Sequence, residues 1–265
     1  MFTKNQRQWT APPLSEQTIA AFKQAWHRWG YYPIISHDSY LTNLASPDAS
    51  VREKSIQAFA QEIIRCSLLD ITLLVTHPGA YKEQTLEQGI RTYVQSLDQA
   101  LDKAGAQDPE SSKVKVLLET TAGQGTCLGA TFQELAAIMD SSNYPERLGI
   151  CLDTCHMFAA GYDLSTRDAF QNSLQQLDRI LGIDRVHAIH LNDCKSGWGS
   201  RKDRHEHIGQ GELGLDAFRL ILNEPGFLRI PMIIETPKDK AGKWDRENLL
   251  ALSNLISSVN SGQAE

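Results

Sequence analysis

The chain has 265 residues, of which 41% are hydrophobic, and a formal net charge of -6. This length fits one α/β domain with a sizeable core, and no apolar run of the sequence is long enough to span a membrane. The negative charge argues against broad, nonspecific binding of nucleic acid. It is compatible with a local basic rim around a metal-filled acidic centre, because bound cations cancel the charge of their ligands.

The cysteines indicate a reducing compartment. Their number is odd and they form no CxxC pair; they are Cys66, Cys127, Cys151, Cys155 and Cys194. Since the first residues also lack a signal-peptide or transit-peptide pattern, we expect a cytoplasmic protein. Cys155 and Cys194 stand beside candidate metal ligands. We interpret them as small buried residues in preference to thiolate ligands.

Six strand-like apolar runs alternate with amphipathic helical stretches, and each run ends on a side chain that can bind a metal. The runs are Tyr32–Ser36 before His37, Asp70–Thr76 before His77, Lys115–Leu118 before Glu119, Leu148–Leu152 before Asp153, Val186–Ile189 before His190, and Pro231–Ile234 before Glu235. The alternation predicts a TIM-type α/β barrel, in which the carboxyl ends of all strands meet on one face. These scattered side chains are therefore expected to be neighbours.

The helical stretches between the runs carry apolar residues at helical spacing, which predicts faces that pack on a core. Four such sets are Ile56, Phe59 and Ile63; Leu86, Ile90, Tyr93, Val94, Leu97 and Leu101; Phe170, Leu174, Leu177 and Leu181; and Leu249, Leu252 and Ile256.

Taken one by one, the strand-end residues have ordinary alternatives. His37 and His77 could be hydrogen-bonded structural residues, and Pro78-Gly79 predicts a tight turn directly after His77. Glu119 and Glu235 end buried runs, where a carboxylate is costly unless it is ion-paired or metal-bound. A salt bridge is the alternative there.

Two segments are denser in candidate ligands. Asp153 and His156 are three residues apart where a strand passes into its loop, a spacing that can serve two metals. His187 and His190 lie on opposite faces of a strand, so His190 is the candidate ligand and His187 is expected to face a helix. Asp203 and His205 form a further pair, whose alternative is a solvated charged loop.

The full candidate set has five histidines and four carboxylates: His37, His77, Glu119, Asp153, His156, His190, Asp203, His205 and Glu235. Nine mixed nitrogen and oxygen ligands are too many for one ion and suit about three ions of zinc or manganese. Clustered metals indicate phosphoryl chemistry, because paired ions stabilise the attacking and leaving oxygens of an in-line displacement.

At these residues the chain resembles the endonuclease IV family of zinc-dependent apurinic/apyrimidinic (AP) endonucleases. The matching segments are FTKNQRQW from Phe2, HDSYL from His37, HPGAY from His77, ETTAGQG from Glu119, CLDTCHMFAAGYDL from Cys151, HLNDCKSGWGSRKDRHEHIGQGELG from His190, and IIET from Ile233. The resemblance covers essentially the whole chain.

The resemblance implies three zinc ions, with manganese possible at one site. The first would be bound by His37, His77 and Glu119; the second by Asp153, His190, Glu235 and a bridging Glu119; the third by His156, Asp203 and His205. It also implies hydrolysis of the phosphodiester 5′ to an abasic site, leaving a 3′-hydroxyl and a 5′-deoxyribose phosphate, and removal of blocking groups from 3′ ends. Glu119 and Glu235 would be catalytic, holding the attacking water between the first two ions.

The resemblance further implies double-stranded DNA as the partner, no membrane association and a monomeric protein. Arg7 would reach the DNA, while Tyr40 and Leu41 would fill the gap left by the flipped abasic nucleotide. Lys195, Arg201, Lys202 and Arg204, with Trp198 among them, would contact phosphates. A solvated loop and a surface aromatic are the alternatives for Arg7 and Tyr40.

The chain departs from the family pattern at its start. Family members begin roughly one strand-helix unit, about 30 residues, earlier. We therefore expect one barrel domain over residues 1–265 that lacks the first strand-helix unit and most of the second strand.

Two other functions stay open at this stage. A sugar isomerase or epimerase of the same barrel type would use similar strand-end ligands with one or two ions. It would leave surplus ligands without a role, namely His37, His77, His156, Asp203 and His205, and it would not need Arg7 and Tyr40. A non-enzymatic protein that binds metal or damaged DNA is the other.

Overall fold

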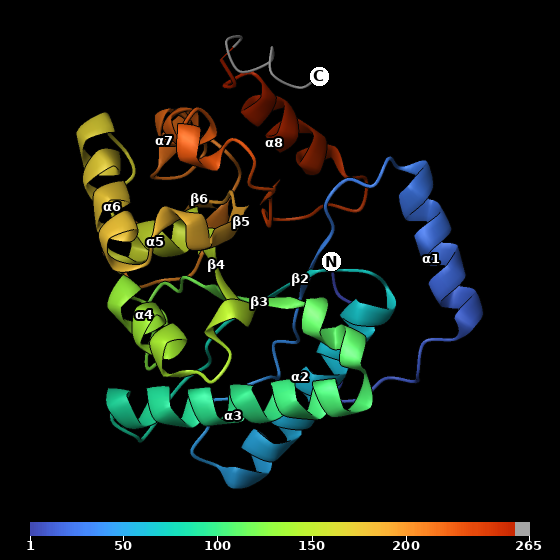
Figure 1. Ribbon diagram of the computed structural model, residues 1–265. Coiled ribbons are helices and arrows are strands. Elements are labelled where there is room, and N and C mark those ends of the chain that lie inside the picture. Colours follow the sequence, from blue (N-terminus) through green and yellow to red (C-terminus); the bar gives the residue numbers. More distant parts are fainter. Residues whose placement is uncertain (258–265) are drawn as a thin grey trace. The chain divides into compact units, whose positions relative to one another are not determined.

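The computed structural model describes residues 1–257. These residues form two compact units. The first comprises Met1–Glu119, Gly125–Leu128 and Glu134–Gly149; the second comprises Thr120–Gln124, Gly129–Gln133 and the chain from Ile150 onward. Each unit combines parallel strands with helices (Figure 1).

The sheet of the first unit has three parallel strands in chain order, β1 (Ile35–His37), β2 (Leu73–Thr76) and β3 (Lys115–Glu119). Ile35 is level with Leu73, and Thr76 is level with Leu118. Met1 lies beside β1, where its amino group donates to the Ile35 carbonyl at 2.6 Å and its own carbonyl accepts from the His37 N–H at 2.8 Å. Strands in this order bring their carboxyl ends, with His37, His77 and Glu119, to one edge.

Helices α1 (Glu16–Arg28), α2 (Ala49–Leu68) and α3 (Leu86–Gln107) follow the loops of this unit, and α2 packs against α3 (Figure 1). Their starts are specified locally. The Asp48 side chain accepts from the N–H groups of Ser50 and Val51, and Thr85 and Gln88 form a capping box. Short 3-10 helices η1 (Pro109–Lys113) and η2 (Pro145–Arg147) precede β3 and β4 (Leu148–Asp153), and α4 (Phe132–Ser141) begins directly after Thr131.

The second unit contains the parallel series β4, β5 (Val186–His190) and β8 (Met232–Ile233), in which β5 lies between the other two. Asp153 is level with His190, and His190 is level with Ile233. Beyond β5, the two short strands β6 (Asp193–Cys194) and β7 (His205–Glu206) pair antiparallel. The helices of this unit are α5 (Thr154–Ala160), α6 (Arg167–Ile180), η3 (Ile183–Arg185), α7 (Gly214–Leu222), η4 (Pro225–Phe227) and α8 (Lys243–Ser253).

All six predicted strands are present, and all six begin or end within a few residues of the predicted runs. The shortest, β8, keeps only Met232–Ile233 of the predicted Pro231–Ile234. Most predicted core positions are buried, including Phe59, Ile63 and Leu97. The prediction was wrong at three positions. Leu86, the first residue of α3, is 41% exposed, Leu249 is 55% exposed, and Ile256, which lies beyond the end of α8, is 50% exposed.

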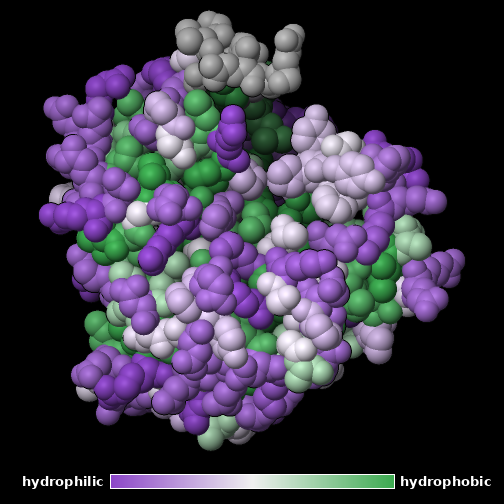
Figure 2. Space-filling view, in the orientation of Figure 1, coloured by the Kyte–Doolittle hydropathy of each residue, from purple (hydrophilic) through white to green (hydrophobic). Residues whose placement is uncertain are grey.

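Hydrophilic side chains cover most of the face seen in Figure 2, with hydrophobic ones scattered between them, as is usual for folded proteins. Within residues 1–257, no helix is both long and apolar enough to cross a bilayer.

Candidate metal centre

A first group of candidate ligands lies at the strand ends of the first unit. His37 ends β1, His77 follows β2 and Glu119 ends β3. The Nε2 atoms of both histidines lie 3.0 Å from Glu119 Oε2, and Glu119 is fully buried. Gly79 has the left-handed φ of +80° and lies beside Asn43, where a Cβ would come within 2.4 Å of Asn43 Oδ1, so glycine is required there. The turn that follows β2 lies at Lys82-Glu83, and the tight turn expected at Pro78-Gly79 is not observed.

The surroundings of His37 select which ring nitrogen faces the group. Its Nδ1 donates to the Asp38 carbonyl at 3.0 Å, so Nε2 is the ring nitrogen that faces Glu119, at 3.0 Å from Oε2. Asp38 itself is buried and accepts from the Thr76 hydroxyl at 3.1 Å. Burial raises the pKa of Asp38 to about 6, although the nearby His37 and His77 act to lower it.

A second group lies at the strand ends of the second unit. Asp153 ends β4, His190 ends β5 and Glu235 follows β8. His190 Nδ1 is 3.4 Å from Glu235 Oε2 and 3.9 Å from Asp153 Oδ2. Asp153 and His190 are almost fully buried, whereas the Glu235 side chain is 31% exposed. The level pairing of Asp153 with His190 across β4 and β5 explains why residues 37 positions apart meet.

A third group joins the start of α5 to the loop around β7. His156 Nε2 and His205 Nε2 are 3.4 Å apart, and Asp203 Oδ1 lies 3.3 Å from the first and 3.4 Å from the second. On the far side of each ring a backbone carbonyl accepts from Nδ1: that of Thr120 for His156 at 2.8 Å, and that of Glu235 for His205 at 3.2 Å. Both rings are therefore held as the tautomer that presents an unprotonated Nε2 to the group.

These distances fit metal ions. A tetrahedral zinc ion with bonds of about 2.0–2.1 Å requires ligand atoms about 3.3 Å apart. In the first group each histidine nitrogen lies 3.0 Å from Glu119 Oε2, and in the third group the ligand atoms are 3.3–3.4 Å apart. The ligand atoms of Asp153, His190 and Glu235 all lie within 4.8 Å of one another. Imidazole and carboxylate donors are also the set that zinc takes. The structure thus assembles all nine candidate ligands into groups that can hold metal.

The predicted DNA-contacting residues of the first unit lie close to the first group. Tyr40 is 68% exposed, and its ring centre is 6.2 Å from that of His37. The loop that carries the exposed Arg7 is tied to the same place, because the Ser39 hydroxyl donates to the Gln6 carbonyl at 2.8 Å. Leu41 is half-buried, with its N–H on Ser39 Oγ.

The predicted basic rim of the second unit is exposed. Lys195, Arg201, Lys202 and Arg204 are all solvent-accessible. Lys195 pairs with Glu206 at 3.6 Å, and Arg201 has the left-handed φ of +53°. Trp198 is 62% exposed and its indole N–H donates to the Gly161 carbonyl. Arg204 and Asp203 are consecutive, which places one member of this rim next to the third group.

The thiols of Cys155 and Cys194 are fully buried, as expected. A hydrogen bond with Cys194 and burial together raise the pKa of Cys155, whereas the same hydrogen bond lowers the pKa of Cys194. His187 is half-buried in β5, where the pairing with β4 shifts by one residue; its expected contact with a helix stays a prediction.

Sequence reasoning missed the residues that support the ligands. Asn192 contacts Asp153 and Glu235, Asp38 adjoins His37, and Thr120 supplies the carbonyl that orients His156. Each lies within two residues of a predicted ligand. The sequence feature that could have identified these supporting residues is a polar side chain within two residues of the end of a buried strand.

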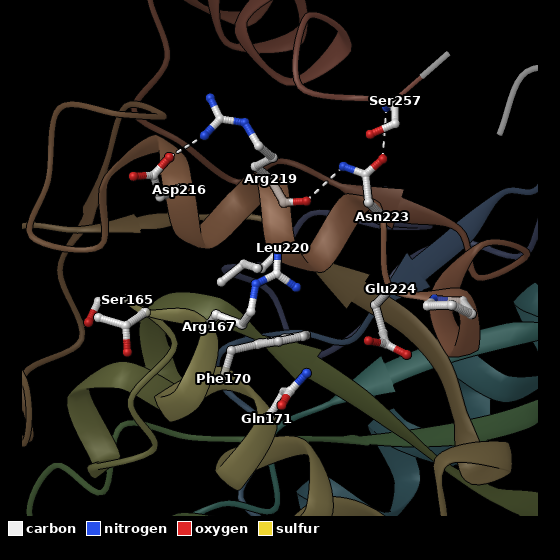
Figure 3. A pocket seen from close by; sticks show the side chains of 12 residues that line it. Ser165, Arg167, Phe170, Gln171, Asp216, Arg219, Leu220, Asn223, Glu224 and Ser257 are labelled. Carbon is white, nitrogen blue, oxygen red and sulfur yellow. Dashed lines mark hydrogen bonds and ion pairs between the residues drawn. The ribbon is translucent and has the colours of Figure 1, made fainter. Parts of the chain in front are cut away.

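A cavity of about 660 Å³ lies elsewhere in the second unit, between the start of α6, α7 and η4 (Figure 3). Arg219 pairs with Asp216 across its rim, and Asn223 donates to the Arg219 carbonyl and accepts from the Ser257 N–H. None of the nine candidate ligands lines it. We therefore assign the chemistry to the strand-end groups.

The chain is similar to proteins of known type over nearly its full length. A family model described as a xylose isomerase-like TIM barrel matches residues 1–255, which confirms the predicted barrel class. A probable endonuclease 4 of Chloroflexus aurantiacus is 48% identical over 97% of this chain and 88% of its own length. The crystal structure of endonuclease IV from Thermus thermophilus superposes with a TM-score of 0.83 at 33% identity, covering 96% of this chain and 87% of that one.

A structure of a D-tagatose 3-epimerase-like protein also superposes, with a TM-score of 0.68 over 91% of this chain and 84% of its own, but at 22% identity. Identity that low shows a shared fold and nothing about the reaction. It gives the sugar epimerase alternative no support beyond the fold.

Proposed function

The chain belongs to the endonuclease IV family, whose members are metal-dependent nucleases, and on that premise we propose that it is a zinc-dependent AP endonuclease. In this proposal it acts as a monomer on double-stranded DNA and hydrolyses the phosphodiester 5′ to an abasic site. The observation that carries the proposal is the third group, in which the ligand atoms of His156, Asp203 and His205 lie 3.3–3.4 Å apart. A barrel enzyme whose site binds only one or two ions does not require this third set of ligands.

The proposed ligands are those implied by the resemblance. His37, His77 and Glu119 hold one ion, Asp153, His190 and Glu235 a second, and His156, Asp203 and His205 a third. We propose zinc at all three, with manganese able to replace it at one. That Glu119 bridges two ions stays a prediction.

When bound, the ions supply a water of lowered pKa and positive charge at the attacking and leaving oxygens of the phosphate. The two catalytic carboxylates have different surroundings. Glu119 is fully buried against two imidazoles and orients them. Glu235 has a side chain that is 31% exposed, so it can reach the attacking water and accept a hydrogen bond from it.

The proposed DNA contacts suit a flipped abasic nucleotide. Such a nucleotide has no base to unstack, so its extrusion costs little and favours this lesion. Tyr40 is an exposed aromatic close to His37 and can fill the space left in the helix. Arg7, Lys195, Arg201 and Arg204 contribute positive charge for the phosphates, although the chain as a whole has a net charge of -6.

The proposal is tested by metal content and incision on the same preparation. Protein purified without added metal is expected to contain about three zinc ions per chain by elemental analysis, and to cut an oligonucleotide duplex on the 5′ side of a single abasic site. A duplex with an ordinary base pair at that position is the control. A chain with one zinc ion or none and no incision would overturn the proposal.

Removal of the metal is expected to abolish incision. In the proposed function the bound ions are the source of the activated water. Dialysis against a strong chelator should therefore reduce the rate to background, and addition of zinc should restore it. Full activity after the zinc content has fallen below one ion per chain would contradict a metal-dependent reaction.

Replacement of Tyr40 by alanine is expected to weaken binding to abasic DNA by about 10-fold or more, because stacking against an aromatic ring contributes about 1–3 kcal/mol. The affinity for undamaged duplex should change little. Tyr32→Ala is the matched control, since Tyr32 is similarly exposed at 61% and lies in the same unit. Equal affinities of Tyr40→Ala and the wild type for the abasic duplex would remove Tyr40 from the DNA-contacting set.

A further inference from the structure

The side chain of Asn192 connects two of the proposed metal ligands within the second unit. Asn192 follows β5 by two residues and is fully buried. Its Nδ2 donates to Asp153 Oδ2 at 2.6 Å, and its Oδ1 accepts from the backbone N–H of Glu235 at 2.7 Å. β5 lies between β4 and β8. The amide of Asn192 therefore connects Asp153, at the end of β4, with Glu235, which follows β8.

The chemistry of its partners dictates the orientation of this amide. The Glu235 N–H can only donate, so the atom facing it is the oxygen, and the NH2 group then faces the Asp153 carboxylate. The backbone of Asn192 is fixed as well. The Thr154 hydroxyl donates to its carbonyl at 2.7 Å and accepts from its N–H at 2.9 Å.

Both ligands are thereby held from more than one side. Asp153 Oδ1 accepts from the His156 N–H at 2.8 Å, and Asp153 Oδ2 accepts from the Asn192 amide. Both carboxylate oxygens are thus hydrogen-bonded, which fixes the plane of the carboxylate. Asn192 also holds the backbone of Glu235, and the carbonyl of Glu235 accepts a hydrogen bond from His205 Nδ1. The position of Glu235 thus bears on the second and third groups together.

We propose that Asn192 is a positioning residue of the metal centre. It sets the direction of the Asp153 carboxylate and the place of the Glu235 backbone, and through Glu235 the tautomer of His205. This inference rests on the proposed function, because it takes Asp153, Glu235 and His205 as metal ligands. Outer partners of this kind commonly change metal affinity by about 10- to 100-fold when they are replaced.

Asn192→Asp tests the hydrogen bond to Asp153 separately from the hydrogen bond to Glu235. The new carboxylate keeps an acceptor for the Glu235 N–H, but it places an acceptor of like charge where the NH2 group faced Asp153 Oδ2 at 2.6 Å. Asn192→Ala is the second variant, since it removes the donor without adding charge and so guards against a folding failure of the first.

Asn248→Asp is a matched control. Asn248 is 3% exposed in the same unit, its Oδ1 also accepts from a backbone N–H (that of Ile208, at 2.9 Å), and its Nδ2 also donates to a side-chain oxygen (that of Thr236, at 2.9 Å). Its Nδ2 also lies 3.2 Å from His207 Nδ1, and none of these three partners is a proposed ligand. The control therefore reproduces the loss of a buried amide without removing a contact to a proposed ligand side chain.

The measurements are zinc affinity, by competition with a chromophoric chelator, and the visible absorption of the cobalt-substituted protein, which reports ligand geometry. For both Asn192 variants we expect about 10- to 100-fold weaker binding of at least one ion and an altered cobalt spectrum. Asn248→Asp should keep the wild-type affinity within a few fold, together with the wild-type spectrum, even if its melting temperature falls.

Wild-type affinity and spectrum in both Asn192 variants would overturn the inference, as would an equal loss in Asn248→Asp. Failure of the proposed function is distinguishable, because it would appear in the unsubstituted protein as absent zinc or absent incision. In that case Asp153, Glu235 and His205 would not be metal ligands, and the inference about Asn192 would also be wrong.

Discussion

Replacement of Glu119 by glutamine is expected to lower the rate of incision by about 100- to 1,000-fold or more, while the protein stays folded. The Glu119 carboxylate is fully buried, and one of its oxygens lies 3.0 Å from Nε2 of both His37 and His77. Glutamine has nearly the same shape, but it brings no negative charge and puts a donor beside a metal. The rate should be measured on an abasic duplex at saturating zinc, with folding checked by circular dichroism.

Glu87→Gln is the control for this prediction, since Glu87 is an exposed carboxylate in the same unit that pairs only with Arg91 among the described residues. It should leave the rate unchanged. Glu235→Gln should show a loss of the same order as Glu119→Gln, because the proposed function makes Glu235 the second catalytic carboxylate. Near-full activity in either variant would remove that residue from catalysis.

Asp193→Asn is expected to destabilise the protein by about 3 kcal/mol. Asp193 is fully buried, and its carboxylate accepts four backbone N–H groups: those of Cys194 at 2.8 Å, Gly209 at 2.9 Å, Gly211 at 3.0 Å and Leu213 at 3.0 Å. An amide can accept on one side only, so two donors lose their partner and each charge-assisted bond is worth about 1.5–3 kcal/mol. The measurement is the shift in the urea midpoint.

The space around Asp193 makes this loss hard to relieve. A Cβ at Gly211 would come within 2.4 Å of Asp193 Oδ1 and 2.5 Å of the Cys194 carbonyl, so the loop is closely fitted to the carboxylate. Asp216→Asn on the exposed surface of α7 is the control and should change the midpoint little. A shift of less than about 1 kcal/mol for Asp193→Asn would show that the four bonds are not what holds this loop.

Much of the fold could be predicted because the relevant signals are local. Apolar runs of four to seven residues, each followed by an amphipathic stretch, identify strands and helices from neighbouring residues alone. This is why β3, β4 and β5 were located almost to the residue. The errors at Leu249 and Ile256 have the opposite cause. Helical spacing shows which residues share a face, but whether another element covers that face is decided by residues distant in the sequence.

The sequence by itself determined the residue types of the metal centre and their positions at strand ends, because the parallel α/β pattern already implies that strand ends converge. Tertiary structure alone decided the arrangement of those residues. The level pairing of Asp153 with His190, the tautomers held by the carbonyls of Thr120 and Glu235, and the amide that links Asp153 to Glu235 all depend on strand register and on contacts between distant segments. No local pattern encodes a register or a hydrogen-bond partner in a distant segment of the chain, since both arise from the packing of the whole sheet.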